Sequence, residues 1–594
     1  MLPALGVALL AASPAIAQVA SPSLPTREEL QAGAPPTEPG QTTQRRPRLH
    51  IDDMVEGSPC ALDDPNYARI KVKITKVTFD HLGPVPEAAI DASWQAYAGT
   101  EQPIGVVCRI RDAAATKLRA MGYIAAVEVP VQRIANGEVR FEVLYARVTS
   151  IRVIGQPGHD ASLLERYLQP LANGRIFNRV TAERNVLLAQ DIPGYDLHLT
   201  LKPSGTGAGN MIAEVRVAHT PVMVDFSASD LAAPSTGRVG GQLRATFNGL
   251  TGLGDQTTLS VYSTSEFRKQ QIYQIGHQFV LGAGGLQLSG HLTYAVTRPD
   301  LGNQTPAVNA HTLYGNAEAV YPLVRRQAVT LRSALGLDVV NQTVTFAGVP
   351  LSRDRLRVAY LRFDFDTLDM RGRGPDATAL WRIAATAEIR HGFAIFGASP
   401  NCLAASAMCI TPGFVPPGVP NGDPKATVFR ASANIDLHPW RWLELSLAPR
   451  VQLASGPVLG FEQFSLGNYT VGRGFAPGAI SGDDGAAFAV EARGPALRFS
   501  ANSRVTVQPY LFCDNGWAWR RRSPIANPQE LHSLGGGVRT NFKGAAQLDL
   551  AVAIPVSDLP GNSPRQNGQF ERNSRPAPLF LASFTTTILP WRYR

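Results

Sequence analysis

The stretch that decides the fold runs from Val329 to Val339 and reads VTLRSALGLDV. Its side chains alternate: one face carries Val329, Leu331, Leu335, Leu337 and Val339, and the other carries Thr330, Arg332, Ala334, Gly336 and Asp338. Because successive side chains of a strand point to opposite faces, the pattern predicts a strand with one apolar and one polar face. Such a strand is expected to lie between an apolar phase and water.

The same alternation recurs in residues 361–366, 443–453 and 548–554, and turn residues separate such segments from about Pro221 onward. A soluble β-sandwich would show the same alternation, but residues 219–594 are long for one sandwich. We therefore predict a β-barrel membrane protein, with lipid outside and a water-filled lumen inside. The segment has room for sixteen antiparallel strands of about 9–11 residues, and fourteen or eighteen strands fit nearly as well.

The composition excludes two other classes of protein. The chain has 594 residues, of which 44% are hydrophobic and 17% are charged. Beyond the N-terminus no uncharged apolar run approaches the ~18 residues of a membrane helix, which excludes a helical membrane protein. The apolar content excludes a wholly disordered chain. The net charge of +9 comes from scattered residues, so no basic face indicates nucleic-acid binding.

The N-terminus has the features of an export signal. Residues 1–17 are mostly apolar and end in a small-x-small cleavage pattern, which predicts a secretory signal peptide. Residues 18–69 form a linker rich in Pro, Thr, Gln and Arg. Within this linker, Thr26 and Glu29 have the spacing of a capping box, which predicts one short helix.

Export makes the five cysteines a question of disulfide pairing. Cys402 and Cys409 lie seven positions apart in a Pro-, Gly- and Ala-rich stretch, which favours a local loop bridge. Cys60 and Cys108 are candidates for a second bridge, which leaves Cys513. Zinc binding is the alternative, but no CxxC pair and no nearby histidine cluster supports it. We expect no metal and no cofactor.

Between the linker and the predicted barrel, two stretches share one order of elements. Residues 70–147 read as strand, helix, helix, strand, strand, with the first strand at 70–74 and a long helix at 104–121. Residues 148–218 repeat that order. A repeat of about 75 residues predicts two small tandem α+β domains.

A glycine-rich segment at residues 461–487 contains the candidate functional residue Arg473. Glycines let a backbone fold tightly, so this loop can enter a lumen. In the strand at 504–514, alternation places Asp514 toward the lumen and Cys513 toward lipid. A guanidinium and a carboxylate partly withdrawn from water pair well, so one interpretation is an Arg473–Asp514 pair. The alternative is that both are ordinary lumen residues that never meet.

The segment resembles the inward-folded loop of outer-membrane transporters that assemble or secrete β-rich proteins, whose signature is VRG followed by Tyr or Phe. The loop motif is matched by Gly472, Arg473, Gly474, Phe475, Gly482, Asp483 and Gly485, and the paired strand motif, Phe-x-Asp-x-Gly, by Phe512, Asp514 and Gly516. The resemblance implies that Asp514 is the barrel-wall partner of Arg473. The chain departs from the signature at Gly472, which stands between Val471 and Arg473.

The two tandem domains resemble polypeptide-transport-associated (POTRA) domains. Two such domains with cysteines at Cys60 and Cys108 resemble the two-partner-secretion branch, the haemolysin-activator and filamentous-haemagglutinin transporters. Residues 248–255, NGLTGLGD, are similar to that branch's first periplasmic barrel turn. The resemblance covers residues 58–594. The plug helix that family members carry is reduced here to about a turn and a half near Thr26.

The resemblance implies a monomeric barrel in the outer membrane of a Gram-negative bacterium, with its N-terminal domains in the periplasm. It would capture an unfolded, β-rich exoprotein of the adhesin or haemolysin type and pass it through the barrel to the cell surface without nucleotide. Outer-membrane lipid is the second expected partner, and nucleic acid is not expected to bind.

Two alternatives remain open. One is a factor of the same superfamily that inserts proteins into the membrane, and the other is a passive porin, against which the twin domains count. An enzyme is not expected, because the sequence has no GxxxxGK[ST] loop, no HExxH motif and no GxSxG around Ser481.

Overall fold

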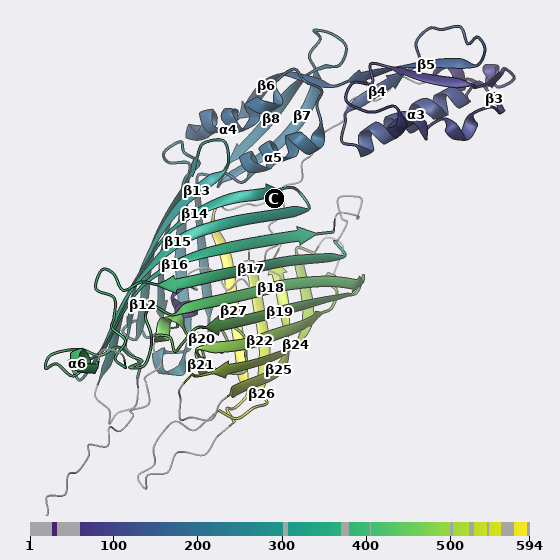
Figure 1. Cartoon of the computed structure of the whole chain (residues 1–594). Helices are drawn as coiled ribbons and strands as arrows, with labels where there is room; N and C mark the ends of the chain where they lie inside the picture. Colours follow the sequence, from purple (N-terminus) through teal and green to yellow (C-terminus); the bar gives the residue numbers. More distant parts are fainter. Residues whose placement is uncertain are drawn as a thin grey trace, which may run out of the picture.

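The computed structural model describes residues 26–31, 60–300, 307–369, 379–403, 406–498, 503–521, 528–542, 546–559 and 575–590. The predicted signal peptide at residues 1–17 and most of the predicted linker at 18–69 lie outside these ranges. Two small domains lie in line, and the second lies against one end of a large barrel (Figure 1). Among the described residues, no helix combines the length and the apolar character needed to cross a membrane.

The first small domain packs two helices on a three-stranded sheet. Its elements are β2 (Lys76–Asp80), α2 (Ala88–Asp91), α3 (Val106–Ala120), β4 (Ala125–Glu128) and β5 (Glu138–Tyr145). The sheet has the order β2-β5-β4, with β2 parallel to β5 and β4 antiparallel to it. The rings of Phe79 and Phe141 stack 5.3 Å apart in the core between the sheet and α3.

The sequence predicts a strand at 70–74 as the first element of this domain, but the three-stranded sheet begins with β2. A strand does form there, β1 (Lys71–Lys73), but it pairs with β3 (Glu101–Pro103) in a separate two-stranded sheet. The reason lies in burial: Lys71 and Lys73 are exposed, whereas the buried alternation of Val77 and Phe79 belongs to β2.

The second small domain repeats this arrangement. Its elements are β6 (Arg147–Gly155), α4 (Ala161–Leu168), α5 (Arg179–Gln190), β7 (Tyr195–Pro203) and β8 (Asn210–His219). The sheet has the order β6-β8-β7, again with one parallel and one antiparallel pair. Leu163, Tyr167 and Val186 from the helices are buried against the sheet.

The barrel is closed by sixteen long antiparallel strands in the described part of the chain, as predicted. They are β9 (Val222–Ser229), β10 (Gly240–Asn248), β11 (Gln256–Thr264), β12 (Gln270–Leu281), β13 (Leu286–Thr297), β14 (Val308–Arg325), β15 (Val329–Phe346), β16 (Val349–Leu368), β17 (Trp381–Gly392), β18 (Thr427–Trp440), β19 (Leu443–Ala454), β22 (Asp484–Arg493), β24 (Val505–Trp519), β25 (Gln529–Phe542), β26 (Ala546–Pro555) and β27 (Leu579–Leu589). The two-residue β23 (Leu497–Arg498) pairs beside β24. Strand β27 pairs with β9, which leaves no open sheet edge.

The two faces of the barrel follow the predicted alternation. In β15, Leu335 and Leu337 are 64% and 42% exposed, whereas Thr330 and Asp338 are 5% and 1% exposed. The exposed apolar side chains therefore form the outer, lipid-facing surface, and the polar side chains line the interior. The second small domain and the end of β27 lie at one end of the barrel, and α6 (Ser406–Cys409) lies at the far end (Figure 1).

Candidate functional site

The inward loop, residues 455–483, connects β19 to β22 and packs inside the barrel. It contains the 3-10 turn Gly460–Glu462 and a hairpin of β20 (Phe464–Leu466) and β21 (Ile480–Gly482). Its buried apolar residues form one cluster with the inner wall, made of Phe464, Leu466, Val471, Phe475 and Ile480 from the loop and Ala448, Ala487, Ala489, Ala518 and Leu531 from the strands. The loop is therefore a packed element of the lumen.

The structure brings Arg473 and Asp514 together. The Arg473 Nη2 and Nε atoms donate to Asp514 Oδ1 and Oδ2 at 2.9 and 3.1 Å, and the Arg473 backbone N–H donates to Oδ2 at 2.8 Å. The guanidinium also lies 3.6 Å from the centroid of the Phe512 ring. Asp514 is fully buried, so the bidentate ion pair and the cation–π contact lie in a site withdrawn from water.

A second carboxylate, which the sequence motifs did not identify, completes this site. Arg473 Nη1 donates to Glu491 Oε2 at 2.8 Å, and Glu491 also pairs with Arg493 at 2.6 Å and Arg539 at 3.5 Å. Burial alone lowers the pKa of the Arg473 guanidinium, but the charges of Asp514 and Glu491 raise it above its ordinary value. We call Arg473, Asp514 and Glu491 the tip lock of the inward loop.

The motif glycines lie where the loop and the wall approach most closely. A Cβ atom at Gly474 would lie 2.9 Å from the Ser533 Cβ atom, and one at Gly516 would lie 2.6 Å from Leu466. Gly472, the departure from the signature, has φ +118°, a conformation that side chains disfavour. This glycine therefore permits the turn that presents Arg473 to the wall.

The remaining motif residues close the loop where it rejoins the barrel. A Cβ at Gly485 would lie 1.9 Å from the Phe464 ring, and one at Gly482 would lie 2.6 Å from Trp519. Asp483 accepts hydrogen bonds from the backbone N–H groups of Val458 and Arg521 at 2.8 and 2.7 Å. Burial raises the pKa of Asp483, and these hydrogen bonds oppose the shift.

A second charge cluster holds the other end of the inward loop. Arg390 on β17 is 1% exposed and donates to Glu462 at 2.9 and 3.0 Å, to Asp338 at 2.6 Å and to Glu388 at 2.8 Å. Arg430 on β18 also donates to Glu462, at 2.8 Å. We call this group of Arg390, Arg430, Asp338, Glu388 and Glu462 the root cluster. It joins β15, β17 and β18 to the start of the loop.

The short helix α1 (Arg27–Gln31) lies in the lumen beside the loop. Its N-terminus is a capping box, in which Glu29 N–H donates to Thr26 Oγ1 and Thr26 N–H donates to Glu29 Oε2. Arg27 lies 4.0 Å from Glu388 of the root cluster. The helix thus shares this cluster with the inward loop.

Apolar packing and burial also hold α1 in place. Leu30 is fully buried among wall residues such as Ile272 and Val340 and the loop residue Phe461. Burial raises the pKa of Glu29 to about 7, and the hydrogen bonds from Thr26 oppose the shift. The buried position therefore favours the neutral form of Glu29 more than water does.

The second small domain is joined to the barrel through turns. Arg325 at the end of β14 makes a bidentate ion pair with Asp191, at 2.6 and 2.7 Å. The Gly254 N–H donates to Asp160 Oδ1 at 2.8 Å, and this glycine belongs to the 248–255 turn singled out in the sequence. Asp255 holds that turn by accepting hydrogen bonds from Thr251 and Leu250. Burial raises the pKa of its carboxyl, but these hydrogen bonds outweigh burial, so the pKa lies below its ordinary value.

A polar cavity of about 880 Å³ lies at this junction. Its lining combines residues of the second domain, such as Tyr195, with inward-facing residues of the strands, such as Gln278, Gln287 and Glu318. The amide and carboxylate side chains offer hydrogen-bond donors and acceptors in the space between the domain and the lumen.

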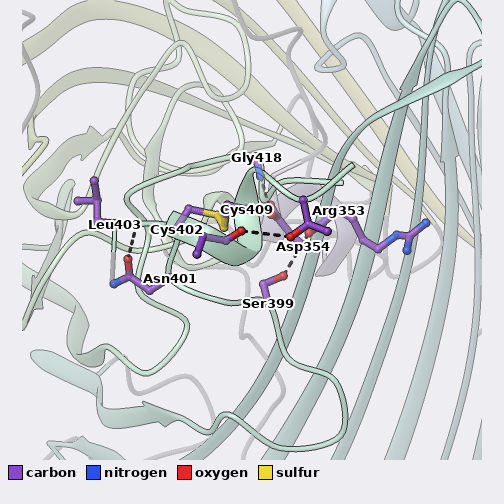
Figure 2. The surroundings of a disulfide bond; sticks show 10 residues. Arg353, Asp354, Ser399, Asn401, Cys402, Leu403, Cys409 and Gly418 are labelled. Carbon is purple, nitrogen blue, oxygen red and sulfur yellow. Dashed lines mark hydrogen bonds between the residues drawn. A yellow bond between two sulfur atoms is a disulfide. The ribbon is translucent and has the colours of Figure 1, made fainter. Parts of the chain in front are cut away.

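The structure pairs Cys60 with Cys108 and Cys402 with Cys409, and Cys513 is free and exposed. Figure 2 shows the second bridge in the loop between β17 and β18, close to Asp354 and Ser399. No group of three or more His, Cys, Asp or Glu side chains suited to a metal ion occurs in the part of the chain that the structure describes.

Comparisons with known proteins place these features in a family. The family model described as haemolysin secretion/activation protein ShlB/FhaC/HecB matches residues 211–540. A search of curated proteins found no match. Among solved structures, CdiB from Escherichia coli is similar with a TM-score of 0.65 and 15% identity, over 90% of this chain and 93% of that chain.

Two further structures share the fold. CdiB from Acinetobacter baumannii has a TM-score of 0.56 and 17% identity, over 92% of this chain and 93% of its own. BamA from Haemophilus ducreyi lacking POTRA domains 1–3 has a TM-score of 0.52 and 12% identity, over 87% of this chain and 100% of its own. The chain belongs to the ShlB/FhaC/HecB family of two-partner-secretion transporters, non-enzymatic outer-membrane β-barrels with POTRA-like domains in the periplasm.

Proposed function

We propose that this transporter captures an unfolded exoprotein in the periplasm and passes it through the barrel to the cell surface. The observation that carries this proposal is that α1 and the inward loop occupy the lumen. Both α1 and the inward loop are tied to the wall by polar contacts at the root cluster, and neither is a strand of the barrel. Elements held in this way can move aside without opening the hydrogen-bonded wall.

The periplasmic domains are suited to hold an extended chain. In the described residues, β7 pairs only with β8, so one edge of this strand is free to accept an added strand. Backbone hydrogen bonds at a sheet edge give affinity with little demand on sequence. Strand β7 begins at Tyr195, which also lines the junction cavity, so a chain bound along β7 would be led toward the lumen.

Passage requires no nucleotide in this proposal. Folding of the exoprotein outside the cell supplies the direction, because a folded β-rich domain cannot return through the lumen. The tip lock would hold the inward loop in the arrangement that supports transport, since its ion pair is buried and its partners are fixed on β22 and β24.

Deletion of the gene tests this function against its two alternatives. We expect a large β-rich protein to disappear from the culture medium, while the other outer-membrane barrels keep their normal amounts. A general loss of outer-membrane barrels would instead identify an assembly factor. A change in solute uptake with unchanged secretion would identify a porin and contradict the proposal.

A further inference from the structure

Three arginines occupy alternate positions at the extracellular end of β16. They are Arg353, Arg355 and Arg357, and the odd-numbered positions of this strand also carry the lipid-facing Leu361, Phe363 and Phe365, which are 40%, 41% and 37% exposed. Because side chains two apart in a strand point the same way, the arginines belong to the outer face of the barrel. This is unusual, since the lipid face of a barrel is otherwise apolar.

The arginines lie at the height of the outer membrane surface. From Phe365 to Arg355 is about ten residues, and a strand tilted by about 40° rises about 25 Å over that length, the height of the apolar band. The neighbouring strands β15 and β14 also carry polar side chains at this level. Arg355 is paired with Asn341 of β15, and Arg353 with Thr343, which is itself paired with His311 of β14. A polar row therefore borders the lipid-facing surface here.

One of the three arginines is structural. Arg357 is 7% exposed and donates to the carbonyl oxygens of Val340, Leu356 and Phe396 and to Asn341 Oδ1, at 2.6 to 3.1 Å. These bonds fix the end of β16 to the loop that follows β17. Arg357 is thus already satisfied by the protein.

The other two arginines have no such partners in the described part of the chain. The structure gives the side chains of Arg353 and Arg355 no ion pair or hydrogen bond with any residue that it describes, although both are partly buried. The adjacent carboxylate, Asp354, lies on the opposite face of the strand, where it accepts a hydrogen bond from Gly418 N–H at 2.7 Å. Figure 2 shows the Arg353 side chain extending away from Asp354 and the disulfide. Among the residues that the structure describes, none supplies a counter-charge to these two cations at the rim of the lipid-facing surface.

We propose that Arg353 and Arg355 form a binding site for a phosphate group of the glycolipid in the outer leaflet, the lipid A part of lipopolysaccharide. Guanidinium groups bind phosphate in a bidentate manner. Basic clusters next to a membrane-spanning surface recognise anionic lipid headgroups in the same way. The lipid is favoured over free phosphate because the same face of β16 carries the exposed apolar side chains of Leu361 and Phe363 farther along the strand.

The test compares lipid retention by the full chain purified in mild detergent, using native mass spectrometry with added lipid A. The double variant Arg353→Ala/Arg355→Ala should bind lipid A about thirtyfold more weakly than the wild type, since each arginine near an anionic lipid surface contributes several-fold. The matched control is Arg441→Ala, which removes an exposed arginine from the turn between β18 and β19 at the periplasmic end. It should bind lipid A as the wild type does. A heat-modifiability gel verifies that all three barrels are folded.

Two further arms identify the ligand. Lipid A from which the phosphates have been removed should bind the wild type as weakly as lipid A binds the double variant. Millimolar inorganic phosphate alone should leave lipid A binding unchanged. Equal retention by the double variant and Arg441→Ala, or equal binding of phosphate-free lipid, would overturn the proposal. Full competition by inorganic phosphate would assign the site to the free ion and overturn the lipid assignment.

Discussion

Arg390 and Glu462 join the barrel wall to the root of the inward loop through two hydrogen bonds, of 2.9 and 3.0 Å, inside a cluster that is almost fully buried. Arg473 and Asp514 hold the tip of the same loop on β24. The loop is therefore held at two separate places, each by an arginine with more than one carboxylate partner. These two attachments are expected to have different functions.

The tip lock should be essential for secretion and dispensable for membrane insertion. Arg473→Ala leaves Asp514 buried without its counter-ion, which costs about 3–5 kcal/mol in the free energy of the locked state. We expect both Arg473→Ala and Asp514→Ala to abolish secretion, measured by immunoblot of the culture medium, while heat-modifiability shows a folded barrel. Arg498→Ala, which changes an exposed arginine of β23, is the control and should secrete normally. Normal secretion by both tip-lock variants would contradict a role of the tip lock in secretion.

The root cluster should keep the channel closed. In Arg390→Ala, Asp338, Glu388 and Glu462 lose their central partner, which loosens the cluster that the start of the inward loop shares with α1. We expect a several-fold rise in conductance in planar bilayers, together with a loss of about 3–5 kcal/mol in stability.

Arg362→Ala is the matched control for the root cluster. Arg362 pairs with Glu318 and Asp364 on the same inner wall, so its removal should destabilise the barrel without raising the conductance. An equal rise in conductance in both variants would show that the barrel has simply loosened.

Closure by α1 should depend on pH through Glu29. Burial raises the pKa of this carboxyl from 4.5 to about 7. A raised pKa means that docking of α1 is most favourable below about pH 4.5, where the docked and the free helix are both protonated, and weakens as the pH rises to about 7. Conductance should therefore increase between these values and level off above them. Glu29→Gln, which remains neutral, should remove the dependence, and an unchanged pH profile in this variant would refute the role of Glu29.

The junction between the second domain and the barrel should depend on one glycine. Gly249 has φ +68°, and a Cβ there would lie 2.7 Å from the fully buried Asp160 Oδ2 atom. Gly249→Ala should therefore loosen the domain and lower secretion about tenfold, through strain of about 1–3 kcal/mol together with the clash. Spin labels on the domain and the barrel would report the broader distance distribution.

Gly282→Ala is the control for that variant. Gly282 has the same φ of +68°, but a Cβ there meets nothing within 4 Å. Only the backbone strain is shared, so a narrow distance distribution and near-normal secretion are expected. Identical behaviour of the two variants would show that the contact with Asp160 has no part in docking.

The architecture and the faces of the strands could be predicted because they depend on local alternation. Leu335 and Asp338 differ in exposure as their positions in the pattern require. The length of the alternating region allows the sixteen strands observed but does not exclude fourteen or eighteen. In the first domain, local alternation is not sufficient. The strand at 71–73 is real, but the choice of its partner depends on which neighbouring residues are buried in the tertiary fold.

The residues that surround the predicted motif could not be found in the same way. Glu491 faces Arg473 because β22 lies beside β24, and alternation in β22 is the only signal that points it inward. Arg390 and Glu462 are 72 positions apart, and their contact depends on closure of the barrel and on the path of a loop. Single positions of this kind carry no periodic pattern.

Cys513 offers a single site for attaching a probe to the barrel. It is the one cysteine of the chain outside the two disulfides, and its side chain lies on the outer face of β24, next to the 68% exposed Leu511. A membrane-permeable thiol reagent can therefore attach a single fluorophore or nitroxide to the unmodified protein within the hydrocarbon layer. Quenching by lipids labelled at different depths would then report how far the barrel sinks or tilts during transport, without any engineered residue.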